Sequence, residues 1–333
     1  MTRLLSRLTL GLGTLAASAP MALAQQVNPT ASSVQEEALM RALQSGETVT
    51  GRITIPDASA SVLIDPGGRD WAILHSGTLQ WITIIAVLGM LALLVIFYLV
   101  RGRIRIDSGF SGRKILRFTM IERFAHWLLA VSFIILALTG LNLILGRALL
   151  LPLIGENAFG TLSAWGKIAH NYLAWPFMLA LVMVFVLWVV HNIPGRLDWI
   201  WLKQGGGLFQ KGVHPPARKF NAGQKLIFWS VIIGGALLSW SGIMLLFPTA
   251  ATSAGEWQFY QVMHAVVSAV MMAIVLAHIY IGSLGMEGAF DAMGNGEVDE
   301  NWAKEHHSLW VEERMKGKTS AKEERGPTAT PAE

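Results

Sequence analysis

Five stretches of the chain are almost entirely apolar, and each is about as long as a membrane-spanning helix. The hydrocarbon core of a bilayer requires about 20 consecutive apolar residues in helical form. Polar or basic segments separate the five stretches. The pattern predicts an all-α integral membrane protein with spans at Trp81–Val100, His126–Leu145, His170–Val190, Leu226–Phe247 and Tyr260–Gly282.

The first residues have the pattern of a secretory signal. Arg3 and Arg7 precede an apolar run, and Ala22-Leu23-Ala24 provides the small-residue pattern of a cleavage site. We therefore expect residues 1–24 to be a cleaved signal peptide. The alternative is an uncleaved anchor helix.

Residues 25–80 are mixed in polarity and form a small periplasmic segment in this interpretation. The segment has a turn signal at Pro66-Gly67-Gly68 and strand character around Gly51–Ile64. It contains no recognisable catalytic group. Its His75 is expected to be a surface or packing histidine.

The distribution of Lys and Arg predicts how the spans are oriented. Six basic residues lie in each of the segments Arg101–Arg117 and His191–Lys225, whereas Gly146–Lys167 holds two and Pro248–Phe259 none. Because cytoplasmic loops carry the excess of basic residues, these two segments should be cytoplasmic. The protein is then expected in the bacterial inner membrane, with a periplasmic mature N-terminus and a charged, solvated cytoplasmic tail over residues 291–333 whose last ten residues are disordered.

Composition supports a membrane protein and limits its chemistry. The chain is 53% hydrophobic and 14% charged, whereas soluble domains carry about 25% charged residues. It has no cysteine, which excludes disulfides, thiolate-bound iron–sulfur clusters and covalent c-type haem. The net charge of +4 resides in loops, so no nucleic-acid partner is expected.

Two histidines, His264 and His278, lie fourteen positions apart in the last span. Ionisable side chains within a membrane span are rare and usually functional. On a helix these two are separated by roughly 21 Å along the axis and by only about 40° around it. Both imidazoles therefore lie on the same helix face, one near each side of the bilayer.

A six-coordinate b-type haem needs two axial imidazoles at the same depth. In the outer half of the membrane, His170 is available to face His264. In the inner half, His278 has two candidate partners, His126 and His191, and spacing does not choose between them. The pattern favours two haem b groups over a histidine-lined transporter, because no internal repeat is present.

Glycines within the spans have two interpretations. Gly140, Gly234 and Gly235 could leave room for a porphyrin face, or they could allow close packing between helices.

Several motifs occur in the order that characterises one family. The chain resembles the gamma, cytochrome b subunit of membrane-bound respiratory formate dehydrogenase over roughly residues 115–310. The residues that carry the resemblance are Glu122-Arg123-Phe124-Ala125-His126-Trp127, Val190-His191-Asn192-Ile193-Pro194, Lys219-Phe220-Asn221-Ala222-Gly223-Gln224-Lys225, the helix with His264 and His278, and Asn301-Trp302-Ala303-Lys304-Glu305-His306-His307.

The resemblance implies a four-helix di-haem b cytochrome bundle over residues 115–290, with 81–100 as an extra N-terminal transmembrane helix. It pairs His170 with His264 on the outer haem and His126 with His278 on the inner haem. His191 is then a helix-end group near a haem propionate.

The resemblance also implies a quinone site beside the inner haem, formed by Asn221 and Gln224. Their amides are suited to hydrogen-bond a quinone carbonyl. The alternative is a helix-capping turn, with Asn221 as N-cap and Gln224 at its third helical position.

The implied function is electron transfer to quinone. An iron–sulfur (beta) subunit on the periplasmic side would supply electrons from a catalytic (alpha) subunit that oxidises formate. Two alternatives remain open at this point: the cytochrome b subunit of a nickel–iron hydrogenase or thiosulfate reductase, and a non-redox membrane anchor.

Overall fold

A computed structural model of the protein describes residues 41, 44–46, 66–247 and 253–323. The predictions of a signal peptide, of strand character around 51–64 and of a disordered C-terminal end fall outside these residues. The chain divides into two compact units, Met1–Ala72 and Ile73–Glu333. Residues 66–68, where a turn was expected, begin helix α3 (Pro66–Ile73), because proline fits the first turn of a helix.

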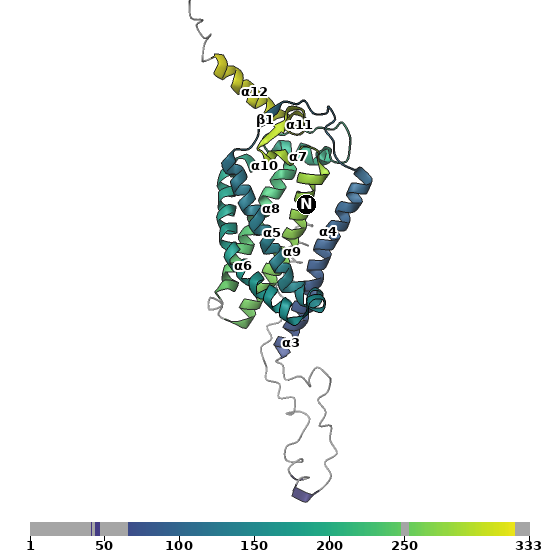
Figure 1. Ribbon diagram of the computed structural model, residues 1–333, viewed down its shortest axis with the longest axis vertical. Coiled ribbons are helices and arrows are strands. Elements are labelled where there is room, and N and C mark those ends of the chain that lie inside the picture. The colour runs from purple at the N-terminus through teal and green to yellow at the C-terminus, as the bar shows by residue number, and fades with distance from the viewer. Residues whose placement is uncertain (1–40, 42–43, 47–65, 248–252, 324–333) are drawn as a thin grey trace, which may run out of the picture. The chain divides into compact units, whose positions relative to one another are not determined.

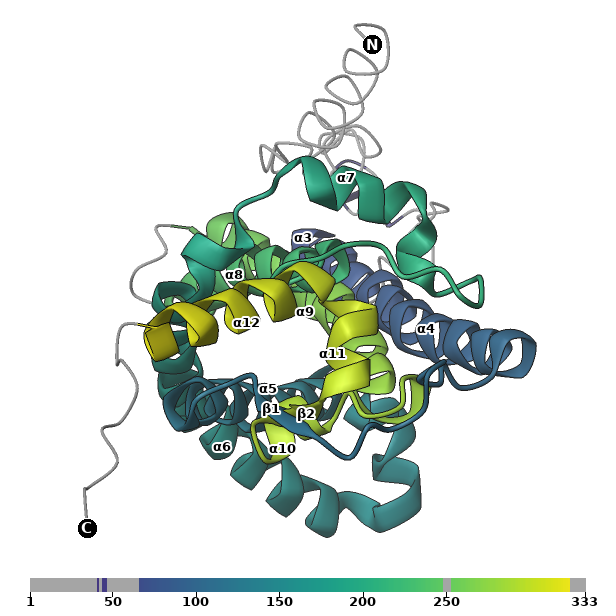
Figure 2. The same cartoon turned by 90° about the horizontal axis from the view of Figure 1, so that it is seen from above.

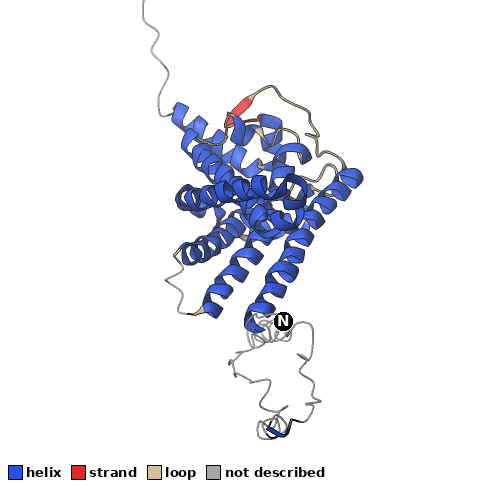
Figure 3. Cartoon of the chain, turned by 60° about the horizontal axis from the view of Figure 1, so that its bottom comes forward, coloured by secondary structure: helices blue, strands red, loops and turns tan. Residues whose placement is uncertain are grey.

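Five helices in the described residues are long and apolar enough to cross a membrane. The all-α membrane fold is therefore confirmed, and Figure 3 shows that strands are confined to one short region. The five helices, labelled in Figure 1, are α4 (Leu79–Arg101), α5 (Met120–Leu149), α6 (Leu151–Trp188), α8 (Ala222–Leu246) and α9 (Ala254–Tyr280). A π-helical turn, η1 (Leu74–Thr78), precedes α4, and a second, η5 (Ile281–Gly285), follows α9.

Side-chain caps determine where three of these helices begin. The Thr119 hydroxyl accepts a hydrogen bond from the Glu122 amide, and the Glu122 carboxylate accepts one from the Thr119 amide. This capping box starts α5 six residues before the predicted span. Asn221 caps α8 in the same way, and Ser253 caps α9. These contacts satisfy amide groups that have no partner within the helix.

The predicted loop over Gly146–Lys167 is wrong, since nearly all of this segment is helical. Helix α5 continues to Leu149, and α6 begins at Leu151. The break in regular geometry comes at Gly155, whose φ of 76° lies in the left-handed region that glycine adopts most readily. The two basic residues of the segment, Arg147 and Lys167, both lie within helices.

The basic segments and the residues after α9 fold together at one end of the helices. We call residues 103–119, 193–221 and 286–311 the cap. Figure 2 views the helices from this end, with α10, α11 and α12 in front. The remaining elements of the cap are β1 (Lys114–Leu116), α7 (Arg196–Lys203), η3 (Gly205–Gly207), α10 (Asp291–Gly294), β2 (Glu297–Asp299), α11 (Glu300–His306) and the start of α12 (Ser308–Glu323). The 3-10 turn η2 (Val189–Asn192) leads into it from α6.

The expectation of a solvated tail over residues 291–333 does not hold for residues 291–311. Strand β2 pairs antiparallel with β1, with Ile115 opposite Val298, and Val298 is fully buried. Trp302 and Trp310 are also buried. Charge along this stretch misled the prediction because the charged side chains face the basic segment while the apolar ones form the cap's own core.

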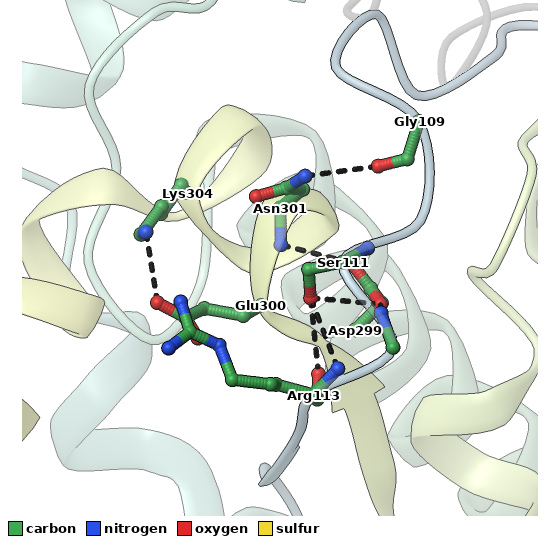
Figure 4. Close-up of polar contacts among 8 residues, drawn as sticks. Gly109, Ser111, Arg113, Asp299, Glu300, Asn301 and Lys304 are labelled. Atoms are coloured by element: carbon green, nitrogen blue, oxygen red, sulfur yellow. Dashed lines mark hydrogen bonds and ion pairs between the residues drawn. The ribbon is translucent and has the colours of Figure 1, made fainter.

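A buried carboxylate at the end of β2 joins the residues after α9 to the segment between α4 and α5. Asp299 is 3% exposed and accepts hydrogen bonds from the amides of Ser111, Gly112 and Asn301 (Figure 4). Burial raises the pKa of the Asp299 carboxyl, but these hydrogen bonds outweigh burial and hold the pKa below its usual value. The carboxylate therefore remains ionised and fixes the two segments together.

Arg117 and His307 form a second buried connection within the cap. The Arg117 guanidinium lies 5.1 to 5.4 Å from the centres of three aromatic rings, those of Phe118, Trp302 and Trp310. It donates a hydrogen bond to His307 Nε2 at 2.9 Å, while His307 Nδ1 lies 2.8 Å from the Arg218 carbonyl oxygen. Because the carbonyl can only accept, Nδ1 carries the proton and the imidazole is neutral. Burial, followed by the Arg117 charge, lowers the pKa of His307 well below its usual value.

The cap should lose stability in mild acid. Burial lowers the pKa of His306 to about 4, against a usual value of 6.5. The unfolded chain therefore takes up a proton below about pH 6.5 that the folded cap refuses until about pH 4, and stability falls across this window. We expect the melting temperature of the purified protein to decrease between pH 7 and pH 4.5.

The variant His306→Phe keeps a ring against Trp302, whose indole lies 5.1 Å from the His306 ring, and removes one titrating group. Its melting temperature should depend less steeply on pH in the same window. A slope equal to that of the parent protein would contradict the assignment.

Candidate functional site

Two pairs of histidines face each other between the spanning helices. The rings of His126 on α5 and His278 on α9 have centroids 6.1 Å apart. The rings of His170 on α6 and His264 on α9 have centroids 6.2 Å apart. One helix, α9, thus supplies one member of each pair, as its fourteen-residue spacing predicts.

The ring separations fit one metal ion between each pair. A metal–imidazole nitrogen bond is about 2 Å long, and the centre of the ring lies roughly 1 Å behind the nitrogen. Two imidazoles on opposite sides of one metal ion therefore have centroids about 6 Å apart. Both pairs have this separation, so the donor set fits the six-coordinate iron of a b-type haem.

Hydroxyl groups orient His170 and His264, which we call the outer pair; His126 and His278 are the inner pair. The Thr139 hydroxyl donates to the Ile135 carbonyl oxygen at 2.7 Å and lies 2.8 Å from His170 Nδ1. Since its proton is used by the carbonyl, the hydroxyl oxygen accepts from Nδ1–H. His170 Nε2 is then unprotonated and available as a metal ligand.

The same arrangement occurs on the opposite side of the outer pair. The Ser241 hydroxyl donates to the Leu237 carbonyl oxygen at 2.7 Å and lies 2.9 Å from His264 Nδ1. Both outer imidazoles are therefore held in the tautomer that presents Nε2 to a metal. Sequence reasoning missed Thr139 and Ser241, because each is on a different helix from the histidine it orients.

A largely apolar cavity of about 260 Å³ adjoins the outer pair. Both His170 and His264 line it, together with Phe133, Gly140 and Gly242. A Cβ atom on Gly140 would lie 3.6 Å from His170 Cε1, and one on Gly242 would lie 3.4 Å from His264 Cε1. These two glycines keep the space beside the imidazoles open.

The other two glycines of the sequence prediction serve helix packing. A Cβ atom on Gly234 would clash with Met271 Sδ, and one on Gly235 would lie 2.8 Å from a Leu181 methyl carbon. Their role is close contact between helices. The structure therefore favours open space beside an imidazole for Gly140 and close helix packing for Gly234 and Gly235.

The structure places His126, and not His191, against His278. His191 is exposed in the turn η2. His126 lies on a buried face of α5, and its Nδ1 atom is buried without a hydrogen-bond partner among the described residues. A buried nitrogen of this kind is costly unless something else satisfies it.

Asn221 and Gln224 form the capping box that was the alternative to a quinone site. The Asn221 side-chain oxygen accepts from the Gln224 amide at 2.9 Å, and the Gln224 side-chain oxygen accepts from the Asn221 amide at 3.1 Å. The neighbouring Lys219 ammonium contacts the Glu122 carboxylate at 2.6 Å. Since Glu122 is one helical turn before His126, this segment lies at the inner-pair end of the bundle.

His75 was expected to be a surface or packing histidine, and the structure places it more specifically. It is half-buried and lines the cavity of the outer pair. The sequence holds no signal for this position, because it depends on how α4 packs against the other helices.

A multi-pass helical protein with facing histidines between its spans has the architecture of a membrane cytochrome of b type, in which axial side chains hold the haem without covalent attachment. The profile of the family described as prokaryotic cytochrome b561 matches residues 117–296, more than half of the chain. The protein belongs to this family, and membership implies haem b and electron transport.

Proteins similar to this chain carry more specific names. The chain is 29% identical over 220 residues to the protein named formate dehydrogenase, nitrate-inducible, cytochrome b556(Fdn) subunit of Escherichia coli (strain K12), a match that covers 65% of this chain and 99% of the relative. It is 28% identical over 205 residues to the cytochrome b556(fdo) subunit of the same organism, covering 61% and 94%. A cytochrome b556 subunit of Haemophilus influenzae is 24% identical over 213 residues, covering 62% and 87%.

Replacing Gly140 by leucine should reduce haem binding at the outer pair. The added side chain begins 3.6 Å from His170 Cε1 and extends into the cavity. We expect less haem per protein, measured from reduced-minus-oxidised spectra of the purified variant.

The matched control is Gly89→Leu on α4, where an added Cβ atom has no neighbour within 4 Å. Both variants remove a glycine from a helix, but only the first fills the cavity. Equal haem content in the two would show that the cavity is not a haem site.

Proposed function

We propose that the protein is the di-haem cytochrome b subunit of a respiratory formate dehydrogenase. The observation that carries the proposal is the presence of two facing imidazole pairs, His170 with His264 and His126 with His278, both anchored on α9. When bound, haem b supplies reversible one-electron chemistry at its iron. The protein's task is to hold, space and insulate the two sites.

The relatives named as formate dehydrogenase subunits support formate as the source of electrons. Oxidation of formate then belongs to a catalytic partner, and an iron–sulfur partner delivers electrons to this chain. The chain itself has no cysteine with which to hold an iron–sulfur cluster. Neither partner's chemistry is therefore required of the residues described here.

The cap supports a direction for the transfer. It contains both strongly basic segments and lies at the His126–His278 end, where Lys219 contacts Glu122. By the positive-inside rule the cap faces the cytoplasm, and the outer pair faces the periplasm. Electrons entering at the outer pair then travel inward, roughly 21 Å along α9. Each charge that crosses stores about 2.3 kcal/mol per 100 mV of membrane potential.

Quinone is proposed to accept the electrons near Asn221 and Gln224. The capping box uses the side-chain oxygens of both residues, so their NH2 groups are the donors assigned to a quinone carbonyl. Their position at the cytoplasmic end allows protons to be taken from that side.

The ligand pairs should be separable by mutation. His264→Ala removes one axial ligand of the outer haem, and formate should then fail to reduce the haem that remains. His126→Ala should remove the inner haem and leave the outer one reducible by formate. Haem content and reduction are read from visible spectra of the complex with its partners.

His191→Ala is the control for the inner pair. His191 is exposed, and it was the other candidate partner of His278 in the sequence. It should retain both haems. Loss of a haem in His191→Ala, or two haems in His264→Ala, would refute the proposed ligands.

The role of Asn221 can be separated from its role as a cap. Serine is also a good N-cap but lacks an NH2 group. Asn221→Ser should therefore keep the melting temperature near that of the parent protein while slowing quinone reduction, with both haems still reducible by formate. Quinol formation at the parent rate would assign Asn221 to capping alone.

A further inference from the structure

Helix α4 lies outside the part of the chain that matches the family, which begins at residue 117. It packs along α9 (Figures 1 and 2). One face of its first turns is buried, with Leu79 at 2% and Thr83 at 1% exposure. The opposite face is lipid-exposed, with Trp81 63% and Ile85 66% exposed.

The buried face of α4 forms one wall of the outer cavity. Leu79 and Thr83 line the same cavity as His170 and His264. The Gln80 side-chain NH2 group donates to the Ile144 carbonyl oxygen at 2.9 Å, which fixes this end of α4 to α5. An element outside the family match thus closes a site built from family residues.

Three polar side chains from three elements line the outer end of this cavity. Lys167 is three residues before His170, and Gln261 is three residues before His264, so each lies roughly 4.5 Å further out along its helix. His75 lies one turn before Leu79 in the π-helical turn η1. All three line the cavity.

This arrangement is suited to bind carboxylates at the edge of an apolar site. A carboxylate taken out of water needs a charged or hydrogen-bonding partner. Lys167 supplies a cation, and Gln261 and His75 supply N–H donors. The π-helical turn that carries His75 is also a feature frequently found at functional sites.

Haem b carries two propionate carboxylates. On the basis of the proposed function, we propose that α4 completes the outer haem site and that His75 binds a haem propionate together with Lys167 and Gln261. His75 is a positioning residue in this proposal, since it touches the edge of the haem and does not ligate its iron. Loss of its hydrogen bond leaves the propionate charge less compensated, which favours the oxidised, more positive iron.

The test is a redox titration of the two haems in the purified complex. His75→Leu should lower the midpoint potential of the outer haem and leave that of the inner haem unchanged. His75→Gln retains an N–H donor and should restore the potential. Lys167→Met should lower the same potential. Leu88 of α4 is 57% exposed, and Leu88→Ala should leave both potentials unchanged.

The outcomes separate this inference from the proposed function. Fewer than two b haems in the parent protein would overturn the proposed function. Two haems whose potentials are unaffected by His75→Leu would overturn only the role of His75. The role of His75 would also be overturned if His75→Gln lowered the potential as much as His75→Leu, because restoring an N–H donor would then have no effect.

Discussion

Four imidazole rings face each other in two pairs between the apolar helices, and this placement constrains the rest of the bundle. A polar ring in lipid is unfavourable unless its nitrogens are satisfied. For the outer pair, hydroxyl groups satisfy one nitrogen of each ring and present the other nitrogen toward the facing ring. Thr139 and Ser241 are in turn held by carbonyl oxygens of their own helices. The helices must therefore meet at matched depths, which fixes how α5, α6, α8 and α9 pack.

The cap shows a different solution to the burial of polar groups. Among the described residues no carboxylate forms an ion pair with Arg117, yet aromatic rings surround it and the neutral His307 accepts from it. Asp299 is satisfied by backbone amides. These two residues join the segment before α5 to the residues after α9. The cap thereby holds the ends of the helices that carry the inner pair.

Helix α4, which precedes the residues matched to the family, adds a wall to the bundle. Two residues of its first turns, Leu79 and Thr83, are buried, while its outer face carries large apolar side chains toward lipid. Leu79 and Thr83 of this helix line the cavity beside the outer pair.

The sequence by itself determined the five spans and the common face of His264 and His278, because hydropathy and helical period are local properties of the chain. It left the partner of His278 open between His126 and His191, it misjudged the α5–α6 connection and the cap, and it did not place His75 beside the cavity. Only the tertiary structure decided these points. Each depends on how one helix rotates and packs against another, and that contact involves residues far apart in the chain, where no local pattern records it.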